Sequence, residues 1–362
     1  MPFKTIQFME WMKTRSQTKI NLSRSGVENL SLKDLEIDLS DLDIQGNNTH
    51  GYPPLLEALG LRYGVPAENV VTTLGASHAI FIICAALLSR GEEVLIEKPA
   101  YEPLLAVPQA LEASILRFER PFGEGYQLDL DQIESLITEK TRLVVLTNLH
   151  NPSGVLLRPS FLEKVVNLTQ KRGVKLMIDE IYLEFLEGRE ARTSFHLADN
   201  IIVTSSLTKV FGLGGLRCGW ILAPSPLAKE MRKIIDYTNV EGVFIGEQIS
   251  ARVIEQLDSV KKKFVPQMIA NRRLVERLIE EEESLDWVEP AGGIVCFPRV
   301  RQEDGGDRLA EILRHTYETS VVPGQFFEDP QNFRLGFGVN PRLLAEGLEN
   351  IKSALRDLVA IG

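Results

Sequence analysis

Residues 206–220 read Ser206-Leu207-Thr208-Lys209-Val210-Phe211-Gly212-Leu213-Gly214-Gly215-Leu216-Arg217-Cys218-Gly219-Trp220. Lys209 stands between hydroxyl residues and a glycine-rich loop, with Ser206 three residues before it and Arg217 eight residues after it. A lysine that forms an imine with a phosphorylated aldehyde needs a neutral amine, a flexible backbone and anion-binding groups nearby. This segment offers all three. It does not fit the dinucleotide pattern G-x-G-x-x-G, because Arg217 occupies the last glycine position.

The composition indicates an ordinary globular protein without nucleic-acid or membrane partners. The chain has 362 residues and a formal charge of −10, whereas nucleic acid and anionic membranes require a basic face. The three cysteines, Cys84, Cys218 and Cys296, show neither metal-ligand nor disulfide spacing, which favours a reducing cytoplasm. The first twelve residues do not read as a signal peptide. The longest apolar run, residues 79–88, is too short to cross a bilayer.

Short apolar runs alternate with helical stretches along the chain. The expected strands are 70–73, 93–96, 114–117, 143–147, 175–178 and 201–204, and the expected helices are 79–88, 103–110, 130–137 and 160–172. This pattern predicts a mostly parallel sheet with both faces covered. A long interrupted helix over 246–283 follows, then strands at 294–297 and 333–336 and helices at 307–319 and 343–359. We therefore expect an α/β fold with a large domain at 46–250 and a small α+β domain formed by 1–45 and 251–362.

Three further segments carry candidate site residues, each with a structural alternative. Gly75-Ala76-Ser77 opens a helix after a strand, where free N–H groups bind anions, although such a turn is as often a plain helix cap. Asp179 follows an apolar strand, at the edge where α/β sheets bind ligands, and there too a helix cap is an alternative. Arg334 lies within a strand-like apolar run, so it requires an anion, which is either an internal carboxylate or a substrate.

Taken together and in order, these segments resemble the motifs of the class I/II aminotransferases that depend on pyridoxal 5′-phosphate (PLP), the aspartate aminotransferase superfamily. The matching segments are Gly75-Ala76-Ser77, Asn148-Leu149-His150-Asn151-Pro152-Ser153-Gly154, Asp179-Glu180-Ile181-Tyr182, the Lys209 loop, and Val322-Pro323-Gly324 ahead of Arg334. The resemblance spans essentially the whole chain. It implies the PLP-dependent transferase fold of type I, PLP as cofactor, an amino acid and a 2-oxo acid as substrates, and a homodimer with sites at the interface.

The resemblance also implies a role for each residue. Lys209 would form the Schiff base and act as general base, Asp179 would keep the ring nitrogen protonated, and Tyr182 and Asn151 would bind the phenolic oxygen. Tyr101 would stack on the ring, while Gly75, Ala76, Ser77, Ser206 and Arg217 would hold the phosphate. Arg334, Asn151 and Gly26 would bind the substrate, with no metal involved. The peptide bond between Asn151 and Pro152 is expected to be cis.

The reaction expected from this family is transfer of an amino group from an L-amino acid to a 2-oxo acid in a ping-pong mechanism. Two other readings remain open: a PLP-dependent lyase or decarboxylase (C–S β-lyase or phospho-amino-acid decarboxylase type) and a non-catalytic PLP-binding regulator. The sequence departs from the family pattern at Leu149, where a proline is usual, and at Gly46–Tyr52, where the usual tyrosine is displaced. The loop at 236–244 contains no lysine or arginine, which predicts a preference for donors with neutral side chains. The alternative is that Arg24 in the N-terminal segment supplies the missing positive charge and binds an acidic donor.

Overall fold

The core of the fold is a seven-stranded sheet with the strand order β2-β8-β7-β6-β5-β3-β4. The computed structural model of the chain describes residues 3–35, 37–186 and 192–361. The strands are β2 (Val70–Thr73), β3 (Glu93–Lys98), β4 (Ser114–Glu119), β5 (Thr141–Thr147), β6 (Lys175–Asp179), β7 (Ile201–Ser206) and β8 (Gly219–Leu222). Within this sheet β8 runs antiparallel to its neighbours β2 and β7, and the other pairs are parallel. The expected mostly parallel α/β sheet is therefore confirmed.

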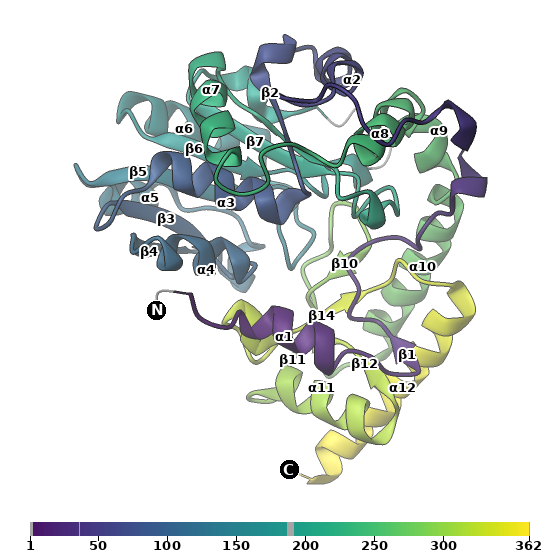
Figure 1. Cartoon of the computed structure of the whole chain (residues 1–362). Helices are drawn as coiled ribbons and strands as arrows, with labels where there is room; N and C mark the ends of the chain where they lie inside the picture. The colour runs from purple at the N-terminus through teal and green to yellow at the C-terminus, as the bar shows by residue number, and fades with distance from the viewer. Residues whose placement is uncertain (1–2, 36, 187–191, 362) are drawn as a thin grey trace.

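Both faces of this sheet are buried under helices (Figure 1). Val94, Leu143 and Val145 face α3 (Ala76–Leu87), α4 (Pro103–Ala110) and α7 (Ser225–Ile235) in one core cluster. The alternate residues Leu95 and Val144 belong to a second cluster on the opposite face. This second cluster includes residues of α2 (Pro53–Tyr63), α5 (Leu130–Leu136), α6 (Pro159–Lys171) and α8 (Phe244–Glu255). Burial on both faces explains why these strands read as continuous apolar runs rather than as alternating ones.

The N-terminal segment and the C-terminal part of the chain lie together below the large sheet (Figure 1). The helices here are α1 (Gln7–Thr14), α9 (Leu257–Lys262), α10 (Val265–Glu281), α11 (Gly305–Thr316) and α12 (Pro341–Ile361). The short strands are β1 (Ile20–Asn21), β9 (Leu285–Asp286), β10 (Val295–Cys296), β11 (Arg299–Val300), β12 (Thr319–Ser320), β13 (Val322–Pro323) and β14 (Phe333–Gly336). β1 pairs in parallel with β12, which joins the N-terminal segment to the C-terminal part. None of the described helices has the length and apolarity needed to cross a membrane.

The expected elements match the structure better in the large sheet than elsewhere. The six expected strands of that sheet are present, each extended by up to two residues at an end. The expected helical stretch at 246–283 is three helices, α8, α9 and α10, and the interruption expected near Pro266 is present, because α9 ends at Lys262 and Pro266 lies in the first turn of α10. Helices α1, α2 and α7 and strand β8 were not expected.

A buried ion pair links β3 to the chain that follows β4. The Glu97 carboxylate lies 2.7 Å from the Arg120 guanidinium, and both side chains are fully buried. We expect Arg120→Leu to lower the free energy of unfolding by about 3–5 kcal/mol, because it leaves the Glu97 charge buried without its partner. The midpoint of urea unfolding measures this loss. Arg142→Leu is the matched control: its ion pair with Glu92 is 46% and 27% exposed, and its removal is expected to cost no more than about 1 kcal/mol. Equal midpoints for the two variants would contradict the prediction.

Candidate active site

A cavity of about 250 Å³ opens where the parallel strands of the large sheet end. Its lining includes nine of the predicted site residues: Ala76, Ser77, Tyr101, Asn151, Asp179, Tyr182, Ser206, Lys209 and Arg217. These residues lie at or after the ends of β2, β3, β5, β6 and β7, and in the loop before β8. The strand order of the sheet therefore brings together segments that are far apart in the sequence. The other three, Gly26, Gly75 and Arg334, contact lining residues.

Lys209 lies in the loop after β7 with its amine directed at the N-terminal segment. Its Nζ donates a hydrogen bond of 3.0 Å to Ser25 Oγ. Burial, reinforced by the positive charge of Arg334, lowers the pKa of Lys209 to about 8, although Asp179 opposes the shift. Gly26 runs along the main chain of Lys209, where an added Cβ would lie 3.4 Å from the Lys209 carbonyl oxygen. The amine is therefore neutral in a larger fraction of molecules than an ordinary lysine at the same pH.

Asp179 is the last residue of β6 and is 5% exposed. Its Oδ1 accepts a hydrogen bond of 3.1 Å from the main-chain N–H of Ile181. Burial raises the pKa of Asp179 to about 7, and the Ile181 bond and Lys209 only partly offset this. A cationic N–H donor in the cavity would stabilise the ionised form of this buried carboxylate, and a protonated pyridine ring supplies such a donor.

The N-terminus of α3 and the Arg217 guanidinium form a cationic corner of the cavity. None of the described side chains caps this helix, whose first residues Ala76 and Ser77 line the cavity. Arg217 donates hydrogen bonds to the carbonyl oxygens of Leu74 at 2.8 Å and Gly214 at 3.1 Å. Gly75 has φ of +86°, and an added Cβ there would lie 2.7 Å from the Arg217 guanidinium. Uncapped N–H groups beside a planar guanidinium are suited to a phosphate.

Arg334 lies on β14 and is 1% exposed. Its guanidinium donates to Asn151 Oδ1 and to the Ser23 carbonyl oxygen, each at 3.1 Å, while its Nε finds no acceptor in the described part of the chain. The rings of Phe8 and Phe327 lie 5.4 and 5.1 Å from its central carbon. Among the residues that the structure describes, no acidic side chain forms an ion pair with Arg334. The internal salt bridge considered from the sequence is therefore not found among these residues.

Helix α1 contributes an apolar wall that sequence reasoning missed. Phe8, Met9 and Met12 line the cavity, and the Phe8 ring lies 5.6 Å from the Tyr101 ring. The Glu102 carboxylate accepts hydrogen bonds from the first two main-chain N–H groups of α1, which fixes the helix to the large sheet. Phe8 and Met12 are four residues apart, a spacing that places both on one helix face and could have indicated the helix.

The expected cis bond between Asn151 and Pro152 is wrong. Among the described residues, the cis bonds are Lys98–Pro99 and Asn148–Leu149. The turn reverses through Gly154, whose φ is +72°, and main-chain hydrogen bonds join Gly154 N–H to the His150 carbonyl and His150 N–H to the Val155 carbonyl. This geometry carries Asn151 into the cavity without a cis bond at Pro152.

Two segments noted from the sequence lie away from this cavity within the described chain. Tyr52 precedes α2, and its ring packs on Phe244 with the centroids 5.3 Å apart. The loop at 236–243 between α7 and α8 lines a different, small cavity together with Asn48 and His50. No group of three or more His, Cys, Asp or Glu side chains in residues 3–35, 37–186 and 192–361 is placed to hold a metal ion.

The fold and the cavity are those of a fold type I PLP-dependent enzyme, and comparisons with known proteins agree. Residues 37–351 match the family model of aminotransferase class I and II. Capreomycidine synthase of Streptomyces vinaceus is 29% identical over 360 residues, which cover 96% of this chain and 92% of that protein. Aspartate aminotransferase of Thermotoga maritima is 27% identical over 86% of this chain and 84% of that protein. The solved structure of the PLP-dependent cyclase OrfR is 26% identical, with a TM-score of 0.89 over 98% of this chain and 97% of that one.

The chain therefore belongs to the class I and II aminotransferase family. It is an enzyme, and its cofactor is PLP. Three features of the cavity match this cofactor in chemical character. The Lys209 amine, whose pKa is lowered, suits the aldehyde, and the buried Asp179 carboxylate suits the ring nitrogen. The cationic corner at Arg217 suits the phosphate.

We expect Gly75→Ala to weaken PLP binding at least about tenfold, or ~1.4 kcal/mol. The added methyl group displaces the Arg217 guanidinium, and the positive φ disfavours alanine. Fluorescence titration of the apoprotein with PLP measures the change. Gly91→Ala is the matched control, because Gly91 has φ of +80° and none of the described atoms lies within 4 Å of an added Cβ. That variant is expected to lose stability but keep its PLP affinity, and an equal loss of affinity in both variants would contradict the role of the contact.

Proposed function

We propose that the protein is an aminotransferase that moves the amino group of an L-amino acid to a 2-oxo acid in two half-reactions. The observation that carries this proposal is the Arg334 guanidinium, which is buried beside Asn151 and has no acceptor for its Nε among the described residues. A buried cation without a carboxylate is costly unless a ligand supplies the anion. An α-carboxylate of an amino acid has the planar geometry that a guanidinium binds with two hydrogen bonds.

The residues around the cavity are suited to hold PLP in one orientation. Asp179 would bind the ring nitrogen, and the Asn151 amide and the Tyr182 hydroxyl would bind the phenolic oxygen. Tyr101 would cover one face of the ring. The N–H groups of Ala76 and Ser77, together with Ser206 and Arg217, would bind the phosphate, and Gly75 leaves Arg217 its place. Gly26 would border the substrate through its contact with the Lys209 main chain.

Lys209 has two tasks in this proposal, and both require a neutral amine. Bound PLP supplies an aldehyde for the lysine and an electron sink for the pair left at the substrate α-carbon. Lys209 Nζ would be the general base that takes the α-proton of the substrate. With a pKa of about 8, about a tenth of this amine is neutral at pH 7, a far larger fraction than for a lysine at the ordinary value of 10.5. Asp179 holds a proton on the ring nitrogen by its negative charge, while Arg334 fixes the carboxylate during the proton transfer.

The apolar wall of α1 favours donors with apolar side chains. Phe8, Met9 and Met12 bring no charge to the cavity, and the charged side chains that line it are Asp179, Lys209 and Arg217. A second carboxylate on the substrate would lie against carbon and sulfur atoms at a cost in solvation. This wall supports the preference for neutral donors that the loop at 236–244 first suggested.

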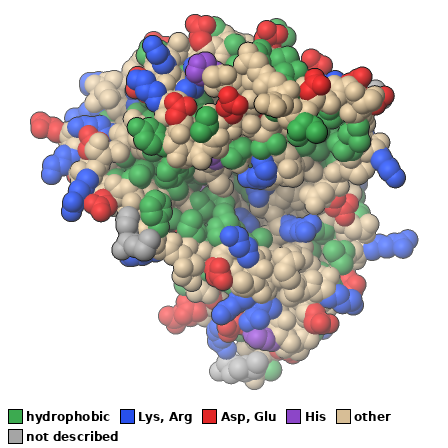
Figure 2. Space-filling view, viewed as in Figure 1, with side chains coloured by type: hydrophobic (Ala, Val, Ile, Leu, Met, Phe, Trp, Pro, Cys, Tyr) green, Lys and Arg blue, Asp and Glu red, His purple; other side chains and the backbone are tan. Residues whose placement is uncertain are grey.

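The proposal includes a homodimer in the cytoplasm, with residues 46–250 as the cofactor-binding domain and residues 1–45 and 251–362 as the small domain. Exposed apolar side chains near the loop at 236–243 support a partner chain, since Tyr237 is 87% and Val240 62% exposed. Acidic and basic side chains are interspersed over the face shown in Figure 2, and hydrophobic ones gather across its middle.

The three cysteines are buried and free, as in proteins of reducing compartments, which supports the proposed cytoplasmic location.

A second candidate is a PLP-dependent reaction other than transamination. The similarity to capreomycidine synthase and to a PLP-dependent cyclase favours this alternative, because both names describe other outcomes on the same fold. Elimination, of the lyase type considered from the sequence, releases a group from the side chain, whereas transamination leaves the side chain intact.

We expect the purified enzyme to convert apolar donors and to discriminate against dicarboxylic ones. The kcat/KM for leucine, methionine and phenylalanine should exceed that for aspartate and glutamate by at least about tenfold, because the α1 wall leaves a distal carboxylate unpaired. The measurement is 2-oxo acid formation with a panel of acceptors. Met12→Arg is the matched variant and should improve aspartate relative to leucine. Release of ammonia or carbon dioxide without acceptor consumption would instead establish the second candidate.

The uptake of PLP by the apoprotein should accelerate as the pH rises through about 8. Only the neutral amine of Lys209 attacks the aldehyde, and its fraction grows as the pH passes the lowered pKa of this lysine. Stopped-flow absorbance at pH values from about 6 to about 9.5 measures the rate. Borohydride reduction followed by peptide mapping should place the cofactor on Lys209, and Lys209→Ala should show no covalent label. A label on another lysine, or a rate independent of pH, would contradict this assignment.

A further inference from the structure

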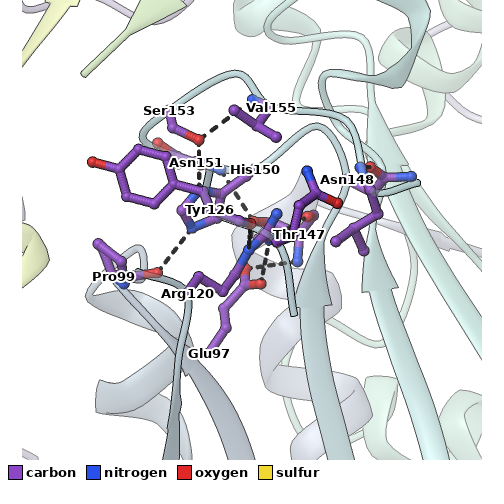
Figure 3. Close-up of polar contacts among 12 residues, drawn as sticks. Glu97, Pro99, Arg120, Tyr126, Thr147, Asn148, His150, Asn151, Ser153 and Val155 are labelled. Carbon is purple, nitrogen blue, oxygen red and sulfur yellow. Dashed lines mark hydrogen bonds and ion pairs between the residues drawn. The ribbon is translucent and has the colours of Figure 1, made fainter. Parts of the chain in front are cut away.

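A buried polar network lies beneath the turn that carries Asn151 (Figure 3). Glu97 of β3, Arg120 after β4 and Thr147 at the end of β5 are each at most 2% exposed. Arg120 holds the Glu97 carboxylate at 2.7 Å and also donates from Nε to the Tyr126 carbonyl oxygen at 2.6 Å. The carboxylate therefore has a fixed position between two strands.

Thr147 connects this fixed carboxylate to the turn. Its main-chain N–H donates to Glu97 Oε1 at 2.8 Å, and its hydroxyl donates to the same oxygen. The hydroxyl oxygen in turn accepts the main-chain N–H of Asn151 at 3.0 Å. A hydroxyl has a single proton to donate, and an ionised carboxylate can only accept hydrogen bonds. The Thr147 hydroxyl therefore directs its proton to Glu97 and a lone pair to the Asn151 N–H.

Asn151 passes this constraint to the ligand-binding groups. Its Oδ1 accepts the hydrogen bond from the Arg334 guanidinium at 3.1 Å, and its side chain lines the Lys209 cavity. The position of one main-chain N–H thus affects two groups, the amide of Asn151 and the guanidinium of Arg334. A hydrogen bond that acts on both is placed to control cofactor and carboxylate binding together.

The rest of the turn has its own anchors. His150 Nδ1 and Ser153 Oγ are 2.7 Å apart, and His150 Nε2 lies 3.0 Å from the Pro99 carbonyl oxygen. The main-chain bonds at Gly154 and Val155 close the turn independently of Thr147. Loss of the Thr147 hydroxyl should therefore shift Asn151 while the turn stays folded.

We propose that Thr147 is a positioning residue, whose hydroxyl, held by the Glu97–Arg120 ion pair, sets the placement of Asn151 and through it of Arg334. Neither Thr147 nor Glu97 nor Arg120 lines the cavity. The inference rests on the proposed function only in that Asn151 and Arg334 contact the cofactor and the substrate carboxylate.

Thr147→Val tests this inference, because valine keeps the shape of threonine and removes the hydroxyl. We expect PLP affinity to fall about fivefold to tenfold and the KM of the donor to rise about tenfold, with kcat changed less than about threefold, as loss of one buried hydrogen bond would cause. The pH titration of the bound-cofactor absorbance should shift by about 0.5 unit or more. Thr147→Ser, which keeps the hydroxyl, should restore all three quantities.

Thr141→Val is the matched control for stability. Thr141 lies at the other end of β5, is 3% exposed and accepts a hydrogen bond from Thr138 N–H through its hydroxyl. This variant should lose stability without any change in PLP affinity or in the absorbance titration.

Two results would overturn the inference: unchanged PLP affinity and absorbance titration in folded Thr147→Val, or failure of Thr147→Ser to restore them. If Thr147→Val does not fold, Thr147→Cys, which keeps the side-chain size and weakens the hydrogen bonds, is judged by the same measurements. The PLP affinity and the absorbance titration require no turnover. They therefore decide the role of Thr147 even if the wild-type enzyme transaminates no donor and the proposed function fails.

Discussion

A guanidinium buried without a carboxylate from the described chain is the constraint on which the cavity depends. Arg334 is held by two neutral oxygen acceptors, from Asn151 and Ser23, and by the faces of two phenylalanine rings. These contacts stabilise the cation only in part, because neutral acceptors and ring quadrupoles attract it less than a carboxylate does. The same charge lowers the pKa of Lys209, so the group suited to the substrate carboxylate also helps keep the amine neutral. Anion binding and amine reactivity are thus coupled through one side chain.

The large sheet and the N-terminal segment contribute different parts of the site. Lys209, Asp179 and Asn151 are positioned by strands buried on both faces, where small displacements are costly. Ser25 and Phe8 come from the N-terminal segment, which is bound to the start of α4 through the Glu102 carboxylate and to the C-terminal part of the chain through the pairing of β1 with β12. Lys209, Asp179 and Asn151 therefore lie at or just beyond the ends of the sheet strands, while the apolar wall lies on a separate helix.

The sequence predicted the large sheet well because its strands are apolar on both faces and bounded by helices. Asp179 and Arg334 stood out because each is a charge after or within an apolar run, and Lys209 stood out because a glycine-rich loop and Arg217 follow it. The strand β8 was missed because Gly219–Leu222 adjoins a glycine-rich loop without a turn signal between them, and its antiparallel direction depends on pairing partners distant in sequence. The two-residue strands of the small sheets leave no periodic pattern to read.

Site residues were missed where the signal lies in two distant segments. Glu97 interrupts an apolar strand, which marks it as unusual, but its partner Arg120 follows a different strand and the two meet only in the folded sheet. Helix α1 is eight residues long, which is too short for a clear periodic pattern in the sequence. Its place at the cavity depends on the hydrogen bond to Glu102 and on the contact of the Phe8 ring with Tyr101. The wrong cis bond came from carrying over a backbone feature of the family, whereas in this chain Asn151 lines the cavity with a trans bond at Pro152.

The apolar wall lies on α1, whereas Lys209 and Asp179 lie at the end of the large sheet, and this separation bears on the proposed reaction. Capreomycidine synthase and aspartate aminotransferase are similar to this chain over most of its length, yet their names describe different outcomes. A sheet that fixes the lysine, the carboxylate and the anion corner supplies the chemistry these reactions share, namely proton removal beside an electron sink. Once the α-proton has been removed, the outcome depends on which side-chain groups the donor brings and where they are held. In this chain the α1 residues that line the cavity, Phe8, Met9 and Met12, present carbon and sulfur atoms and offer no acid to a leaving group. This apolar wall therefore supports the transamination that we propose, because it brings no group that would assist loss from the side chain of a donor.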